Sequence, residues 1–248
     1  MEYRQLGSTE LQVSALAAGG YPFGPPLLNQ NEATRVIHRA LEVGVNLFDT
    51  SDVYGEGFSE QFIGNALAGN RDQVYLSTKF NLLNLNGQTP ADRINQRCDE
   101  ALRKLQTDYI DLFQVHFATS ETPHEQLLRP LDDLIRAGKV RYIGNCNTAS
   151  WRLSEELAVA DQLGLAPFVS TQNHYSLLYR HAEVELMPFL NSRGLSLLSY
   201  FPLGGGWLTG TYRPKQPFPT GSRAAKVPTG IVTRMRSERV EHLVTALE

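Results

Sequence analysis

From residue 45 onward, short β-rich runs alternate with longer segments of helical period, and this alternation constrains the fold more than any other feature. The candidate strands are the runs VNLFD, VYLSTKF, YIDLFQVH, VRYIGNC, FVSTQN and LSLLSYF. Amphipathic segments separate them, for example ADRINQRCDEALRKLQ and TASWRLSEELAVADQLG. A repeating unit of roughly 30 residues of this kind predicts a parallel sheet covered by helices.

The residues before this repeat have a different pattern. YRQLGSTELQVSALAAGG predicts a small β-hairpin that turns at Gly7 and Ser8, followed by a first strand near Ser14 to Ala18. NEATRVIHRALEVG predicts a first helix, and SERVEHLVTALE the start of a last one. The dipeptide TP supplies an N-cap and a proline at the first helical position of ADRINQRCDEALRKLQ.

A repeating βα pattern leaves two closures open, the eight-stranded barrel and the open doubly wound sheet. No GxGxxG motif follows the first strand, and the glycine cluster LGGGWLTG comes after the last strand and misses the spacing at Thr209. We therefore expect an α/β fold of the (β/α)8 TIM barrel type with an N-terminal β-hairpin. Residues 1–248 are expected to form one domain that lacks the eighth strand and helix.

Charge and cysteine content restrict the classes of partner and of metal site that the sequence predicts. The formal net charge is -3 and no window is dominated by Lys and Arg, so neither nucleic acid nor an anionic membrane is expected as a partner. The two cysteines, Cys98 and Cys146, lack a CxxC spacing, which fits a reducing cytoplasm and predicts no structural metal site. The first residues lack a basic segment followed by an apolar one, and no stretch approaches 18 consecutive apolar residues, so we expect a soluble, non-secreted protein. The oligomeric state stays open.

One polar residue stands at the carboxyl end of each strand from the second to the seventh. These residues are Asp49, Lys79, His116, Asn147, Gln172 and Tyr200. They are separated by 30, 37, 31, 25 and 28 residues, one βα unit each. Any one of them alone is explained by loop capping, solvation or packing. A barrel brings all six to one rim, where barrel active sites are built, so together they predict a site.

Tyr54, in the loop after the second strand, completes a set suited to carbonyl reduction. A phenol titrates near pH 10, and we expect the Lys79 ammonium to lower that pKa while Asp49 holds the lysine in place. Tyr54 is then a general acid, and the His116 imidazole can donate to the substrate oxygen. Reduction also needs a hydride donor, and Asn147 and Gln172 suit a nicotinamide carboxamide. Tyr200 offers a flat face for the nicotinamide ring.

Two other functions fit parts of this pattern. The first is a module that binds a nicotinamide cofactor and regulates a partner with little turnover. The second is a metal-dependent barrel hydrolase or isomerase with Asp49 and His116 as ligands, which needs more acids or histidines at strand ends than the sequence offers. The substrate-selecting loops carry no readable code, so the carbonyl compound is not predicted.

The chain resembles the aldo-keto reductase superfamily, in particular the short-looped type that includes potassium-channel β-subunits. The matching motifs, in order, are FDTSDVYGEGFSE, STKF, DYIDLFQVH, GKVRYIGNCN, TQNHYSLLYR and SYFPLGGGWLTGTY. The resemblance implies a (β/α)8 barrel that binds NADPH across its rim and reduces a small-molecule carbonyl substrate. It implies a catalytic tetrad of Asp49, Tyr54, Lys79 and His116. It also implies cofactor contacts from the side chains of Asn147, Gln172 and Tyr200 and from the loop holding Leu203, Gly204 and Gly206.

Three departures from the family pattern bear on the cofactor. Cys146 stands where serine is common, and Phe201 stands where serine usually follows the stacking ring. The family's eighth strand and helix carry most groups for the adenosine 2′-phosphate, and here the sequence stops at Glu248. Either the chain is truncated or the cofactor site is incomplete, and exposed sheet edges are expected. Residues 211–239 form a basic, proline-containing stretch that predicts a long loop, either solvated or screening the cofactor phosphates.

Overall fold

A computed structural model describes residues 1–117, 122–228 and 230–247. It begins with an antiparallel hairpin of β1 (Tyr3–Gln5) and β2 (Gln12–Ser14), which confirms the predicted hairpin. The predicted first barrel strand near Ser14 to Ala18 is wrong in position, because β3 spans Ala18–Gly19. Ser14 belongs to the hairpin, where it pairs with Tyr3 and donates its N–H to the Asn46 side chain at 2.6 Å.

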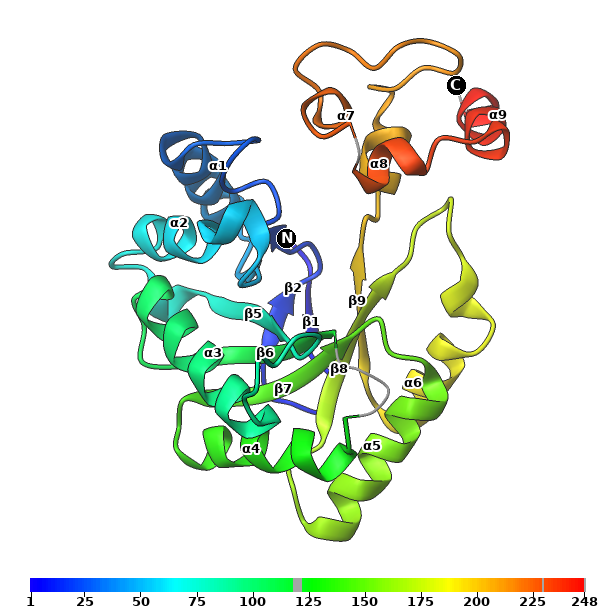
Figure 1. Ribbon diagram of the computed structural model, residues 1–248. Coiled ribbons are helices and arrows are strands. Elements are labelled where there is room, and N and C mark those ends of the chain that lie inside the picture. The colour runs from blue at the N-terminus through cyan, green and yellow to red at the C-terminus, as the bar shows by residue number, and fades with distance from the viewer. Residues whose placement is uncertain (118–121, 229, 248) are drawn as a thin grey trace.

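Seven parallel strands form one curled sheet in which each strand pairs with the next one along the chain (Figure 1). After β3 come β4 (Leu47–Asp49), β5 (Tyr75–Asn81), β6 (Ile110–Phe117), β7 (Val140–Cys146), β8 (Phe168–His174) and β9 (Ser196–Tyr200). The six predicted β-rich runs are therefore confirmed. β3 and β9 lie at the two ends of the strand order. The sheet is that of a (β/α)8 barrel without an eighth strand in the described part of the chain.

Helices connect these strands and lie around the outside of the curled sheet (Figure 1). They are α1 (Gln30–Glu42), α2 (Ser59–Ala66), α3 (Pro90–Leu105), α4 (His124–Arg136), α5 (Ser150–Leu163) and α6 (Leu186–Arg193). α3 begins as predicted, since the Thr89 side chain accepts from the N–H of Asp92 and Pro90 opens the helix. Among the described residues, no helix combines the length and apolarity that crossing a bilayer requires.

The hairpin closes the amino-terminal end of the sheet. Its apolar residues and those of the neighbouring strands form one buried cluster, made of Leu6, Leu11, Val13, Leu47, Leu112 and Val169. The N–H of Gly7 also donates to Ser196 Oγ at 2.7 Å, which ties the hairpin to the start of β9. Because this end is filled, the carboxyl ends of the strands form the face that is available for a site.

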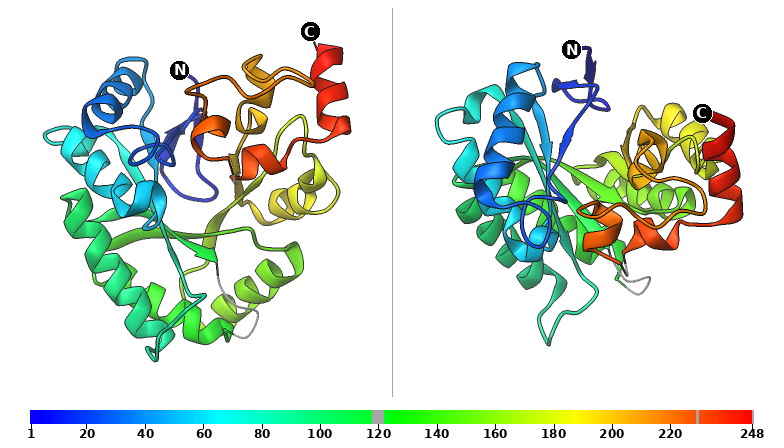
Figure 2. Two further views of the ribbon diagram at one scale, coloured as in Figure 1. Left: turned by 45° about the horizontal axis from the view of Figure 1, so that its top comes forward. Right: turned by 90° about the horizontal axis from the view of Figure 1, so that it is seen from above.

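The chain after β9 folds over that face. A 3₁₀ turn (Gly204–Thr209) leads to α7 (Arg223–Lys226), α8 (Ile231–Arg234) and α9 (Glu238–Leu247), so the predicted long loop is interrupted by short helices. A separate small core of Trp207, Tyr212, Ala224, Val232 and Val244 holds this segment together. α7 lies near the loop after β3 (Figure 2). From this helix, Lys226 Nζ donates to the carbonyl of Leu27 at 3.0 Å.

Two glycines let the loop that carries Tyr54 pack against the loop after β3. Gly55 has φ +55°, and a Cβ there would lie 2.1 Å from the carbonyl oxygen of Phe23. Gly24, with φ +130°, faces it, and a Cβ at that position would lie 2.5 Å from the carbonyl oxygen of Gly55. The backbones therefore touch, and only glycine permits this approach. The short 3₁₀ turn Tyr54–Gly57 is held by this contact directly in front of α2.

We expect Gly55→Ala to lower the free energy of unfolding by about 2 kcal/mol or more, because it adds a backbone clash to the cost of a left-handed φ. The matched control is Gly69→Ala, where φ is +79° but nothing lies within 4 Å of the added Cβ. That variant should lose only about 1 kcal/mol. Urea denaturation of both variants measures the difference. Equal losses would show that the contact between the two loops is not tight.

Candidate active site

A buried ion pair lies at the centre of the candidate site. Lys79, in β5, has a side chain that is 0% exposed, and its Nζ lies 2.6 Å from Asp49 Oδ2 at the end of β4. The same ammonium donates to the carbonyl of Thr50 at 2.8 Å. Burial pulls the pKa of Lys79 down, but the negative charge of Asp49 outweighs it and holds that pKa above its usual range. Lys79 is therefore a fixed cation.

Three uncharged side chains hold the other oxygen of the carboxylate. Asp49 Oδ1 accepts from Ser77 Oγ at 2.9 Å and from the side-chain amides of Gln114 and Gln172, both at 3.1 Å. These donors come from β5, β6 and β8, so the carboxylate is anchored across the width of the sheet. A carboxylate with this many donors cannot turn away from the lysine without leaving several polar groups unpaired.

Tyr54 and His116 lie beside this pair. Lys79 Nζ is 4.8 Å from the centroid of the Tyr54 ring, and the Tyr54 and His116 ring centroids are 5.8 Å apart and nearly perpendicular. The ring of Tyr21, from the loop after β3, packs edge-on against Tyr54 at 5.4 Å. The structure thus brings Asp49, Tyr54, Lys79 and His116 together at one rim, as the sequence predicted.

The pKa of Tyr54 differs from the sequence-based expectation. Burial raises the pKa of this phenol above its usual 10, and although the Lys79 ammonium acts to lower it, the ammonium does not outweigh the burial. The expected net lowering is therefore wrong for the protein as it stands. The lysine still has the predicted sign of effect, since without it the phenol would be a weaker acid.

His116 is neutral near pH 7 in this environment. Burial, together with the nearby Lys79 charge, lowers the pKa of His116 to about 4. Its Nδ1 lies 3.2 Å from Ser51 Oγ. A neutral imidazole carries one N–H and one bare nitrogen, so it can offer a substrate oxygen a hydrogen bond but not a full positive charge.

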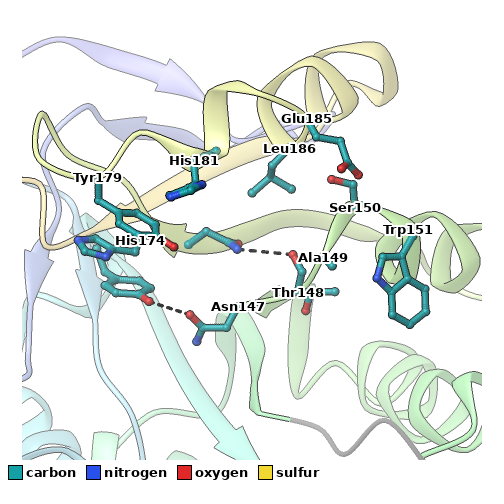
Figure 3. Close-up of a pocket in the computed structure, with 13 residues that line it drawn as sticks. Asn147, Thr148, Ala149, Ser150, Trp151, His174, Tyr179, His181, Glu185 and Leu186 are labelled. Carbon is teal, nitrogen blue, oxygen red and sulfur yellow. Dashed lines mark hydrogen bonds between the residues drawn. The ribbon is translucent and has the colours of Figure 1, made fainter. Parts of the chain in front are cut away.

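The residues predicted to contact a carboxamide form a second group beside the first. Asn147 directly follows β7, and its Oδ1 accepts from the Tyr200 hydroxyl at 2.8 Å (dashed in Figure 3). Tyr200 lies against His174, with ring centroids 5.3 Å apart and planes 14° from parallel. Gln172 joins the two groups through its bond to Asp49.

A cavity of about 460 Å³ opens next to Asn147, between the start of α5 and the loop after β8 (Figure 3). Its walls include Asn147, Trp151, His181 and Tyr200. None of the predicted catalytic tetrad lines it. The cavity therefore adjoins the predicted carboxamide contacts and lies to one side of the ion pair.

The loop predicted to hold a pyrophosphate is built on glycines in left-handed conformations. Leu203 is exposed, and Gly204 and Gly206 follow it with φ of +59° and +112°. A Cβ on Gly204 would lie 2.7 Å from Leu178 Cδ1, and one on Gly206 would lie 2.9 Å from the ring of Tyr212. These glycines are thus required by close packing beneath the loop. Within the described residues, no hydrogen bond joins them to the ion pair.

Sequence reasoning did not single out several residues that the structure places in the site. Ser77 and Gln114 each stand two positions before a predicted site residue, and side chains two apart in a strand share a face. That period-two signal could have found them. The sequence indicates Arg223 only as one cation of the basic stretch 211–239, because it comes from α7 and reaches the site only through the fold. Its guanidinium carbon lies 4.1 Å from the ring centroid of Tyr21 and 4.9 Å from that of Phe201.

Two of the departures from the family pattern, Cys146 and Phe201, also have structural explanations. The Cys146 thiol lies 3.9 Å from Gln114 Oε1, and burial raises its pKa to about 12, so it stays a neutral donor. Phe201 supplies a ring that packs against Arg223. Across residues 1–117, 122–228 and 230–247, no three His, Cys, Asp or Glu side chains gather as a metal site would need.

Comparison with known proteins places the chain in a family. The sequence profile of the Aldo/keto reductase family matches residues 15–247. The chain is 33% identical to the uncharacterized oxidoreductase YrpG of Bacillus subtilis over 97% of this chain and 74% of that protein. It is 33% identical to a probable voltage-gated potassium channel subunit beta of Oryza sativa subsp. japonica, over 91% of this chain and 70% of that protein.

Among solved structures, the aldo-keto reductase AKR11C1 from Bacillus halodurans, in its holo form, matches with a TM-score of 0.73 and 32% identity. The match covers 90% of this chain and 72% of that one. Sequence and structure therefore agree with the resemblance seen in the motifs. The chain belongs to the aldo/keto reductase family, whose members are oxidoreductases that act on carbonyl compounds with a nicotinamide cofactor.

Proposed function

We propose that this protein reduces an aldehyde or ketone to an alcohol with NADPH, and that Tyr54 is the general acid. The observation that carries the proposal is the buried Lys79 ammonium, fixed by Asp49 and lying 4.8 Å from the Tyr54 ring centroid. A phenol beside a fixed cation is a better acid than the same phenol buried alone. His116 lies beside it, with its ring nearly perpendicular to the Tyr54 ring, so both side chains are near enough to reach the same substrate oxygen.

Each group has a separate task in this proposal. Tyr54 gives its proton to the oxygen of the substrate as negative charge develops there. Lys79 stabilises the resulting phenolate, and Asp49 prevents the ammonium from moving toward solvent. Neutral His116 donates one hydrogen bond to the same substrate oxygen, which orients the carbonyl before reaction.

The donor set suits a nicotinamide cofactor. Gln172 uses its N–H₂ on Asp49, and Asn147 uses its oxygen on Tyr200, so within the described residues a Gln172 oxygen and an Asn147 N–H₂ remain for a carboxamide. His174 stacks on one face of Tyr200, which leaves the other face for a flat ring. When bound, the reduced nicotinamide supplies the hydride.

Arg223 is the residue best placed to meet a cofactor phosphate. Its Nη2 is buried and has no hydrogen-bond partner within the described part of the chain. The rings of Tyr21 and Phe201 hold the guanidinium at the rim. A buried guanidinium N–H without an acceptor is costly, and a phosphate oxygen would satisfy it. This supports a role for the basic stretch in cofactor binding, and it favours NADPH over NADH if the phosphate that Arg223 meets is the 2′-phosphate.

A second candidate function is a cofactor-binding regulatory module with little turnover. The similarity to the rice channel subunit beta favours considering it. The two functions differ in one measurement, since a regulatory module binds NADPH without sustained consumption when an aldehyde panel is added. Nicotinamide fluorescence reports the binding, and loss of nicotinamide absorbance reports the turnover. The cofactor preference and the cytoplasmic location stay predictions.

Tyr54→Phe should reduce carbonyl turnover by at least about a hundredfold, because it removes the proton donor and keeps the ring. Cofactor binding should hardly change. Tyr21→Phe is the matched control, since it removes a hydroxyl from the neighbouring ring that the mechanism does not use. Steady-state rates and an NADPH titration measure both effects. Full activity in Tyr54→Phe would remove this residue from the mechanism.

Lys79→Met should move the alkaline limb of the reduction profile to higher pH and lower the rate on the plateau. Tyr54 must be protonated to donate, so reduction declines as pH rises through its pKa. Without the ammonium that pKa rises further, and the phenol becomes a weaker acid. The pH dependence of kcat, measured on protein shown to be folded by circular dichroism, tests this. An unchanged limb would mean that Lys79 does not tune Tyr54.

Arg223→Met should weaken NADPH binding by about tenfold, the scale of one charge-assisted hydrogen bond. Arg239→Met is the control, since Arg239 is an exposed cation of the same basic stretch. Titrations with NADPH and NADH locate the contact. An equal loss of affinity for both cofactors places Arg223 at the pyrophosphate, and a loss of affinity for NADPH alone places it at the 2′-phosphate. Unchanged affinity for both cofactors would exclude Arg223 from the site.

A further inference from the structure

Ser51 lies between a buried carboxyl group and the histidine of the candidate site. It is 0% exposed and follows β4 by two residues. Its Oγ is 3.0 Å from Asp52 Oδ1 and 3.2 Å from His116 Nδ1. A serine hydroxyl has one proton, so it can donate to only one of these two atoms at a time. The atom to which Ser51 donates therefore determines which nitrogen of His116 carries hydrogen.

Two arrangements satisfy all three groups. When Asp52 is ionised it only accepts, so Ser51 donates to it and must accept from His116 Nδ1–H; Nε2 is then bare. When Asp52 is protonated it can donate to Ser51, which donates to Nδ1, and Nε2 then carries the hydrogen. The second state holds one more proton than the first, and solvent takes or supplies it. No covalent bond between heavy atoms changes.

We propose that Asp52, acting through Ser51, sets the tautomer of His116 and so switches its Nε2 between a hydrogen-bond donor and an acceptor. Asp52 and Ser51 are positioning residues, because among the described residues their side chains form no hydrogen bond to Asp49, Tyr54 or Lys79; backbone bonds alone join Asp52 to Lys79 and Ser51 to Tyr54. The inference rests on the proposed function for its consequence: only the donor tautomer can hold a substrate carbonyl. Reduction should therefore weaken as Asp52 ionises.

The surroundings of Asp52 determine its charge. Its side chain is 6% exposed, and Oδ2 lies 3.6 Å from Arg97 Nε without a hydrogen bond. Arg93 and Lys104, also from α3, add positive charge nearby, and Glu60 from α2 adds negative charge. Burial outweighs the favourable contacts and raises the pKa of Asp52 above its usual value. The neutral form therefore persists to higher pH than in an exposed aspartate.

The surroundings of His116 keep it neutral, so its tautomer determines which nitrogen can donate a hydrogen bond. Lys79 and Asp49 face it from one side, and the ring of Tyr54 packs edge-on against it. Its pKa of about 4 keeps the ring uncharged at neutral pH, where only one nitrogen bears hydrogen. Ser51 makes the hydrogen bond to Nδ1. The second nitrogen is then free for a substrate, and its character follows from the first.

The test is nitrogen NMR of the protein with ¹⁵N-labelled histidine, without cofactor or substrate, across a pH series. The His116 signals are assigned by their loss in His116→Gln. In the unaltered protein the ratio of the two His116 tautomers should change by about fivefold or more with pH, the scale of one hydrogen bond. Asp52→Asn should remove this change and keep Nε2 protonated, because the amide can donate to Ser51 at every pH.

Two further variants complete the test. Ser51→Ala, a small change in a tightly packed site, should also abolish the pH-dependent ratio and serves if Asp52→Asn folds poorly. Glu60→Gln is the matched control, since it neutralises a buried carboxylate beside the same cations but bonds to Thr78 and not to Ser51. It should keep the pH-dependent ratio. We call the path from Asp52 through Ser51 to His116 the relay. A tautomer ratio that stays pH-dependent in Asp52→Asn or Ser51→Ala, or a pH dependence that disappears in Glu60→Gln, would overturn the relay.

Turnover separates the relay from the proposed function. Suppose that the His116 tautomer changes with the ionisation of Asp52, and that the kcat of Asp52→Asn no longer declines with pH over the same interval. The relay and the proposed function are then both supported. If the His116 tautomer changes with the ionisation of Asp52 but kcat does not, the relay is supported and His116 is not the hydrogen-bond donor to the substrate. The free-protein spectra therefore decide the relay whatever the activity measurements show.

Discussion

The Asp49 and Lys79 ion pair is the interaction on which the rest of the site depends. Removing two charges from water is expensive unless each is fully satisfied. The sheet meets that requirement with donors from three strands on one carboxylate oxygen and with the carbonyl of Thr50 on the ammonium. The pair is thus a product of the barrel as a whole. A change in the relative position of the strands would leave a buried charge without its partners.

That dependence explains how the tetrad and the supporting residues are divided between strands and loops. The charged pair lies on β4 and β5, where backbone ladders fix positions most firmly. Tyr54 lies on a loop, yet the contact between Gly55 and Phe23 removes most of the freedom a loop would have. Rigid strands hold the groups whose misplacement costs most, and a glycine contact brings the reacting group to them.

The sequence could predict the strands and the residues at their ends because both follow from local pattern. β-rich runs mark the strands, and a shared period of one βα unit places Asp49 and Tyr200 on the same rim. The predicted position of the first strand is wrong because the end of the hairpin is set by Asn46, which bonds to the backbone of Ser14 from 32 residues away. Arg223 and the contact of Ser51 with His116 likewise depend on approaches between distant segments. No local pattern encodes those distances.

The cover formed after β9 differs from the barrel in how it is attached. It meets the loop after β3 through the side chain of Lys226 and the stacking of Arg223 between Tyr21 and Phe201, while β3 and β9 themselves are the last strands of the sheet order. Side-chain contacts of this kind can separate without breaking a strand ladder. The attachment of the cover and the assembly of the ion pair therefore rest on separate sets of contacts, so the two are governed by different free energies.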